Sequence, residues 1–181
     1  VGVATGIIDK KNIIDGSKIK NGDAVLGLPS NGLHTNGYSL ARKLMFDTLK
    51  MKVNDVLPGH TATVKDVLLA PHKNYSMVIN DLIIKKQSIS GVAHITGGGL
   101  IDNIPRILPK DLSVEIDTNS WEKIPIFEFM SKTLDLKSDE LYRTFNMGIG
   151  LVFVVDNNKK EEILELLKNE GCVEIGRTIK D

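Results

Sequence analysis

Apolar and polar residues follow one another along the chain in blocks that predict both strands and helices. Short, uninterrupted or alternating apolar runs predict strands, and apolar residues three or four positions apart predict helices. The predicted strands cover residues 1–9, 23–28, 91–95, 113–117, 151–155 and 172–179. The predicted helices cover residues 38–51, 65–69, 71–86, 100–108, 125–134, 139–143 and 158–168. Pro71 places the start of the third helix, because proline suits a first helical turn.

Capping signals support several of these helix starts. Asn36 or Ser39 is a candidate cap for the helix over residues 38–51, and Ser138 is a candidate cap for the helix over residues 139–143. Asn158 and Glu161 have the spacing of a capping box, which marks the helix over residues 158–168 as the clearest one.

The order of elements predicts one α/β or α+β domain over residues 1–181, with a mostly buried sheet covered by helices. A length of 181 residues is enough for one substantial core. The chain starts directly in strand-like sequence, Val1-Gly2-Val3-Ala4, without an initiator methionine. That start suggests a piece of a longer protein.

Charge and cysteine content exclude several classes of function. Lys plus Arg and Asp plus Glu each number 23, so the formal net charge is zero. Nucleic-acid partners and anionic membrane surfaces are therefore not expected, because both require a basic excess. No apolar run approaches a transmembrane length, and no signal-peptide pattern opens the chain. The single cysteine, Cys172, excludes an internal disulfide and is expected to be a small buried hydrophobe in a reducing compartment.

Three glycine-rich loops carry the candidate chemistry. They span residues 30–39, 94–99 and 143–150, each next to a predicted strand end or helix start, where ligands of α/β sheets collect. In the second loop, Gly97, Gly98 and Gly99 stand between a strand and a helix. Such a turn directs backbone N–H groups at an anion, most often a phosphate. A tight turn needed only for packing has the same pattern, so both interpretations stay open.

Each loop also contains side chains suited to binding or proton transfer. His34 lies in the first loop and His94 opens the second, and either imidazole could bind phosphate or move a proton. Arg143 could pair with a phosphate or carboxylate, and Asn146 could offer an amide to a substrate. Each side chain also has a structural alternative. His34 could bond to the backbone of its loop, and His94 could be a hydrogen-bonded residue of the core. Arg143 could cap a helix C-terminus, and Asn146 could lie in a turn.

Other common sites are missing from the sequence. There is no P-loop pattern, no G-x-G-x-x-G fingerprint and no G-x-S-x-G nucleophile elbow. No cluster of aspartates suggests a metal–triphosphate site, so no metal ligands are assigned. His60 and His72 have no supporting neighbours in sequence and are interpreted as surface or structural residues. The residues alone thus predict a phosphate-binding α/β module without a complete catalytic set.

The three loops, taken with their order, also resemble those of a known family. The motifs are SNGLHTNGYSL at residues 30–40, AHITGGGLIDNIPR at 93–106 and YRTFNMGIG at 142–150. Over essentially its whole length the chain resembles the C-terminal domain of the aminoimidazole ribonucleotide synthetase, or phosphoribosylformylglycinamidine cyclo-ligase, family. Related domains occur in formylglycinamidine ribonucleotide synthetase, selenophosphate synthetase and thiamine-phosphate kinase, and an enzyme of that kind is the alternative. A purely structural or interaction domain is a third hypothesis.

The resemblance implies an activity and an architecture. The family closes the imidazole ring of formylglycinamidine ribonucleotide with ATP and magnesium, as a cytoplasmic step of purine biosynthesis. Nucleotide and metal are held mainly by an N-terminal domain that this sequence lacks, and the full-length enzyme is a homodimer. The C-terminal domain is expected to be a three-layer α/β/α structure with a mixed, partly ferredoxin-like sheet. Alone it is expected to be inactive.

The resemblance also assigns residues to roles. His34 and His94 are expected to be catalytic. The expected substrate- and phosphate-binding residues are Asn36, Gly37, Thr96, Gly97, Gly98, Gly99, Arg143 and Asn146. Pro29, Asn31, Thr35 and Met147 depart from the family pattern. Met147 stands where many relatives have cysteine, so no essential thiol can act at that position here.

Overall fold

The computed structural model describes residues 3, 5–85, 87–134 and 136–181. Its strands are β1 (Ala24–Pro29), β2 (Ile89–His94), β3 (Leu112–Ile116), β4 (Ile149–Val155) and β5 (Val173–Lys180). Its α-helices are α1 (Tyr38–Arg42), α2 (Val64–Leu68), α3 (Ser76–Ile84), α4 (Gly99–Asn103), α5 (Pro125–Thr133), α6 (Ser138–Thr144) and α7 (Lys160–Leu166). Short 3₁₀ or π turns complete the set: η1 (Lys10–Asn12), η2 (Lys43–Thr48), η3 (Ile104–Ile107), η4 (Asn157–Lys159) and η5 (Lys168–Glu170).

The five strands form one sheet in the order β2-β4-β1-β5-β3. Each of the four pairings is antiparallel, where the family resemblance implied a mixed sheet. The chain contains two β-α-β units, β1-α3-β2 and β4-α7-β5, and their strands alternate in the sheet. The four strands β2-β4-β1-β5, with α3 and α7 as crossover helices, have the ferredoxin-like arrangement. The fifth strand, β3, extends the sheet beyond β5.

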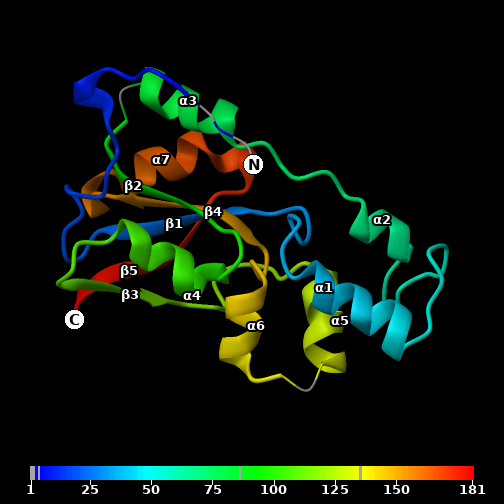
Figure 1. The fold of residues 1–181 in the computed structure, drawn as a ribbon. Coiled ribbons are helices and arrows are strands. Elements are labelled where there is room, and N and C mark those ends of the chain that lie inside the picture. Colours follow the sequence, from blue (N-terminus) through cyan, green and yellow to red (C-terminus); the bar gives the residue numbers. More distant parts are fainter. Residues whose placement is uncertain (1–2, 4, 86, 135) are drawn as a thin grey trace.

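Both faces of the sheet are covered, which gives the expected three layers (Figure 1). On one face Leu26 and Phe153 pack against α3 and α7, through residues such as Leu82 and Ile163. On the other face Val25, Val152 and Val154 pack against Leu100 and Ile104 of α4 and η3. Strand β4 is buried at all seven positions because it lies between two neighbours and between two helical layers. The α/β class is therefore confirmed.

A separate helical group extends from one end of the sheet (Figure 1). Helices α1, α2, α5 and α6 and the turn η2 contribute its core, which contains Met45, Ile126, Phe127, Met130 and Phe145. Phe145 is fully buried and directly precedes the loop that enters β4. The group therefore supports the third glycine-rich loop from outside the sheet.

Most predicted elements are present, but several boundaries were wrong. The helix predicted from Pro71 begins at Ser76, because the side chain of Asn74 accepts from the backbone N–H of Ser76. Asp156, not Asn158, caps the turn before α7, accepting from the Asn158 N–H. Neither Asn36 nor Ser39 caps α1, whose cap residue is Gly37. Helix α6 includes Ser138 rather than beginning after it.

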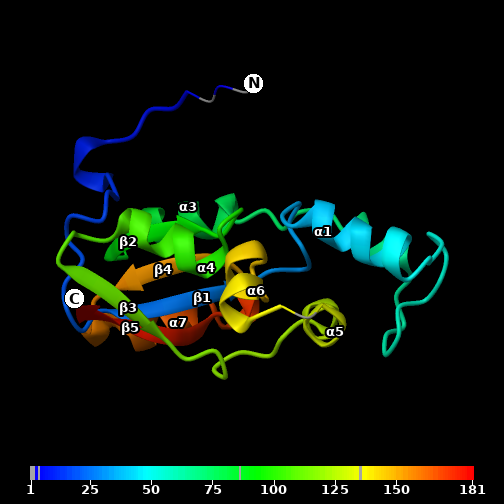
Figure 2. The same ribbon diagram turned by 60° about the horizontal axis from the view of Figure 1, so that its bottom comes forward.

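The strand predicted over residues 1–9 is not formed. Val3 and residues 5–9 have no regular structure, and residues 1, 2 and 4 lie outside the described part. Residues 5–9 run away from the body of the molecule (Figure 2). Ile7 is fully exposed, so its apolar character does not reflect a place in the sheet.

Candidate functional site

The three glycine-rich loops meet at one end of the sheet. Strands β1 and β2 both run antiparallel to β4, so their C-terminal ends lie beside the N-terminal end of β4. Pro29 of β1 is opposite Ile149, and His94 of β2 is opposite Leu151. The loops that follow β1 and β2 and the loop that precedes β4 must therefore emerge together. The topology therefore brings the three glycine-rich loops to the same end of the sheet.

Asn146 ties the first loop to the third. Its side-chain oxygen accepts from Ser30 Oγ and from the Gly148 N–H, both at 2.9 Å, and its Nδ2 donates to the Gly32 carbonyl at 2.8 Å. The residue is fully buried. Its amide is thus used inside the protein, which favours the structural interpretation of Asn146 over the expected substrate contact.

The glycine turn at residues 97–99 is held by a second buried asparagine, Asn103. Its Nδ2 lies within 3.3 Å of the carbonyl oxygens of Thr96, Gly97 and Gly99. The Gly99 N–H donates within the turn, to the Thr96 carbonyl at 2.9 Å. The N–H groups of Gly97 and Gly98 donate to no acceptor in the described part of the chain. This is the geometry of an anion-accepting turn.

The three glycines have different reasons to be glycine. A Cβ on Gly99 would overlap the Tyr142 carbonyl oxygen, so this glycine allows α4 to approach α6. Gly98 has a φ of +102°, in the region that favours glycine. A Cβ on Gly97 would meet only Asn36 Oδ1, at 3.8 Å, so packing among the described residues does not require a glycine there. The backbone at Gly97 is therefore open on the side where a side chain would stand.

Arg143 reaches the glycine turn by pairing with Asp102. The two side chains form an ion pair beside Gly98, where a Cβ would lie 3.1 Å from Asp102 Oδ2. The guanidinium therefore offsets the one carboxylate next to the turn. Arg143 remains 55% exposed in its side chain, so it can also face a ligand.

The first loop is conformationally strained around His34. His34 and Thr35 have positive φ values of 50° and 61°, which are uncommon for residues other than glycine. Gly37 also has positive φ, and a Cβ there would overlap the Phe145 ring. Asn36 donates from Nδ2 to the His34 carbonyl at 2.9 Å. Strain of this kind is concentrated at functional sites, and here it directs Asn36 toward Gly97.

His34 is buried, with only 3% of its surface exposed. Its Nε2 lies 2.6 Å from Asn31 Oδ1, whose orientation is set because Asn31 Nδ2 donates to the Pro71 carbonyl. The backbone N–H groups of Asn31 and Lys73 also point at Nε2, at 3.2 and 3.5 Å. Nδ1 is buried without a partner among the described residues. Burial, together with nearby His72, His94 and Lys73, lowers the pKa of His34 to about 4.

His72, interpreted from the sequence as a surface or structural residue, contacts both His34 and His94. The His72 ring stacks on His34 with centroids 4.0 Å apart, and its Nε2 lies 3.2 Å from Nε2 of His94. Tyr75 lies edge-on to all three rings and donates its hydroxyl to the Pro29 carbonyl at 2.9 Å. The interpretation of His72 as a residue without a constellation was wrong, because its neighbours are distant in sequence.

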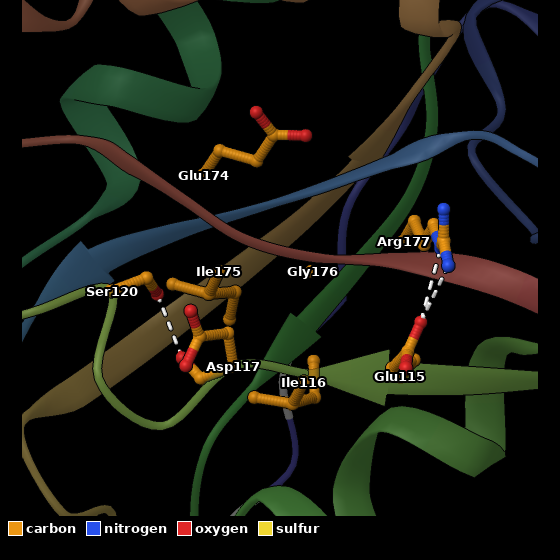
Figure 3. A pocket seen from close by; sticks show the side chains of 8 residues that line it. All are labelled: Glu115, Ile116, Asp117, Ser120, Glu174, Ile175, Gly176 and Arg177. Atoms are coloured by element: carbon orange, nitrogen blue, oxygen red, sulfur yellow. Dashed lines mark hydrogen bonds and ion pairs between the residues drawn. The ribbon is translucent and has the colours of Figure 1, made fainter.

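A charged hollow of about 410 Å³ lies over the other edge of the sheet, on β3 and β5 (Figure 3). Three of its charged side chains, those of Glu115, Glu174 and Arg177, are already in ion pairs within the protein. Arg177 binds Glu115 at 2.9 Å, and Glu174 binds Lys160 of α7 at the same distance. Ser120 donates to the Asp117 carbonyl. A ligand would have to displace these contacts, so the loop end of the sheet is the better candidate site.

Searches for other kinds of site gave negative results. Over residues 3, 5–85, 87–134 and 136–181, no group of three histidine, cysteine or acidic side chains is arranged to hold a metal ion. Within the same residues, no helix has the length and hydropathy of a membrane span. Cys172 is buried as predicted, and burial raises the pKa of its thiol to about 12. The loop end therefore offers imidazoles, backbone amides and one guanidinium.

Comparison with known proteins identifies the relatives of this chain. Three are named phosphoribosylformylglycinamidine cyclo-ligase, from Geotalea uraniireducens, Geobacter metallireducens and Alkaliphilus oremlandii. They are 44%, 47% and 45% identical, over 99%, 99% and 94% of this chain. The matched region is 52%, 52% and 50% of those proteins, so the chain spans about half the length of its relatives.

The fold is shared with a more distant protein of known structure. A thiamine-monophosphate kinase from Stenotrophomonas maltophilia K279a superposes with a TM-score of 0.63 over 96% of this chain and 52% of its own, at 13% identity. The family model described as "AIR synthase related protein, C-terminal domain" matches residues 20–181. This match includes all three loops, and the chain belongs to that family of AIR synthase related C-terminal domains.

Proposed function

We propose that this chain is the C-terminal domain of a phosphoribosylformylglycinamidine cyclo-ligase. In this proposal it supplies one wall of a site where ATP activates the formyl amide oxygen of formylglycinamidine ribonucleotide. An internal nitrogen then attacks, phosphate leaves and the imidazole ring closes. The observation that carries the proposal is the convergence of the three loops at one end of the sheet, in a chain 43–47% identical to proteins of that name.

The site residues take different parts in this proposal. The N–H groups of Gly97 and Gly98 receive a phosphate, with Asn36 next to them and Arg143 balancing Asp102. His94, on the open side of the cluster, handles a proton at the amide. His34 is neutral at physiological pH and buried, so it supports the neighbouring ring rather than acting as an acid. Gly37, Gly99 and Asn146 hold the loops together.

ATP and magnesium complete the proposed reaction. The described residues offer backbone amides for phosphate but no carboxylate cluster for a metal, so the magnesium ligands are assigned to the N-terminal domain of the same enzyme. That domain, which forms the homodimer in this proposal, faces the loop end of the sheet. The compartment is the cytoplasm. A nucleic acid or membrane partner is not part of the proposal.

The test compares Gly97→Ala with a control variant in the full-length protein. Gly97→Ala introduces a methyl group that the fold accommodates, so any loss reflects a ligand that approaches the backbone. We expect unchanged thermal unfolding and a fall in ring-closure rate of about 10²-fold, the effect of losing a backbone contact in such a site. Thr178→Ser is a matched control, because Thr178 lies on β5, remote from the loops.

Two results would count against the proposal. An unchanged ring-closure rate in a folded Gly97→Ala variant would show that the phosphate does not bind at this turn. Absence of ring closure in the folded unmodified protein, with phosphorylation of another small molecule instead, would support a different ATP-dependent enzyme of the superfamily.

A further inference from the structure

His72 projects from the loop before α3 and meets the end of β2. Its Nδ1 lies 2.8 Å from the Lys73 carbonyl oxygen. A carbonyl oxygen only accepts, so Nδ1 carries the proton of neutral His72 and its Nε2 carries a lone pair. That lone pair faces Nε2 of His94 at 3.2 Å, so His94 must be the donor in this contact. The tautomers of both rings follow from a single backbone carbonyl.

His34 fixes the ring of His72 from behind. The two rings are stacked 4.0 Å apart with an angle of 26° between their planes. His34 itself is held by Asn31, and Asn31 is held by Pro71 at the start of the same loop. His72 is therefore held by the stacked ring of His34, by the Lys73 carbonyl at Nδ1 and by His94 at Nε2.

We propose that His72 is a positioning residue for His94, and that their facing Nε2 atoms hold one proton between them at the mouth of the candidate site. The first added proton enters at Nδ1 of His94, because its Nε2 already carries a proton. The arrangement then still has one proton between the two rings. A second added proton must enter between the facing nitrogens and break their contact.

The surroundings oppose that second proton. His34 and Tyr75 face the pair, and Lys73 lies in the same loop, although its Nζ is paired with Glu170 Oε2 at 3.3 Å. Burial, followed by the charge of His72, lowers the pKa of His94. Two charged imidazoles at 3.2 Å would repel each other. The singly protonated pair can thus give the added proton from Nδ1 of His94 to a departing oxygen and return to its neutral state, which is the step that places this inference within the proposed function.

The decisive measurement is a histidine titration by NMR, in the full-length protein labelled at histidine Cε1 and kept in chelator. We expect His72 and His94 to respond to each other's protonation, in two steps separated by more than about one pH unit. His72→Phe keeps a ring on His34 but removes the acceptor, and it should leave His94 with a single step. His60→Phe is the matched control, because His60 packs against Phe129 away from the cluster.

Activity supplies a second readout through a conservative variant. His72→Gln offers an amide oxygen to His94 and should keep most of the ring-closure rate, whereas His72→Phe should lose about tenfold. Independent single-step titration of His72 and His94 in the unmodified protein would overturn the inference. So would an unchanged His94 titration in folded His72→Phe. An unmodified protein that shows the coupled titration but no ring closure would refute the proposed function and leave the histidine pair standing.

Discussion

Replacing Asn146 with alanine tests whether the three loops depend on one buried side chain. The substitution removes three buried hydrogen bonds and leaves the Gly32 carbonyl, the Gly148 N–H and the Ser30 hydroxyl without that partner. At about 1 kcal/mol net for each bond, the free energy of unfolding should fall by about 3 kcal/mol. For a chain of this length that corresponds to a melting temperature about 6–12 °C lower.

Urea and thermal unfolding of the chain, followed by circular dichroism, measure this loss. Trp121, the only tryptophan, adds a local probe because its Nε1 donates to the Met147 carbonyl at 2.9 Å, next to Asn146. Asn158→Ala is the matched control, since it removes an exposed asparagine bond and should cost less than about 0.5 kcal/mol. A loss below about 1 kcal/mol in Asn146→Ala, together with a large loss of activity, would refute the structural role and restore the expected substrate contact.

Three further predictions concern buried groups. Gly99→Ala should unfold the chain or lower its melting temperature far more than Gly97→Ala, because only Gly99→Ala drives a methyl group into the Tyr142 carbonyl. Thermal unfolding of the two variants in parallel measures this difference, and equal melting temperatures would contradict it. The lowered pKa of His34 predicts that its contribution to stability is full above about pH 6.5 and is lost as the pH falls toward 4, since the unfolded chain binds the proton more readily. His34→Gln should lack this part of the pH dependence in denaturation series. Cys172, with a raised pKa, should react with a thiol reagent at pH 8 only when urea unfolds the chain, and rapid reaction in the native state would show that the thiol is accessible.

The sequence predicted the regular elements best where burial and periodicity agree. The uninterrupted apolar run in β4 is buried on both faces, so its pattern has one structural interpretation. Residues 1–9 also contain several apolar residues, but burial depends on what else the chain places there, and Ile7 contacts solvent. The helix start predicted at Pro71 was also wrong. The Asn74 side chain accepts from the Ser76 N–H, so α3 begins at Ser76 and not at Pro71.

The candidate site was predictable as a set of loops and not as a set of contacts. Glycine-rich segments at strand ends gave the loops, and the order of strands explains why they meet. His72 lies 38 residues from His34 and 22 from His94, so no local pattern signals their stack. Asn146 was assigned to substrate because a polar residue in a loop has the same appearance in sequence whether it faces inward or outward. Only burial separates the two.

The interleaved sheet has a consequence for how the protein is made. Strands β1, β2 and β3 each pair only with β4 or β5. Ala24, at the start of β1, therefore cannot pair until Val155 and Arg177 have been synthesised. During translation, the apolar segments of these three strands leave the ribosome before any partner strand exists. Sheet assembly therefore waits until β4 and β5 have been synthesised, with long loops to close. Nascent chains that stall before residue 149 would be strong clients for chaperones that bind extended apolar segments.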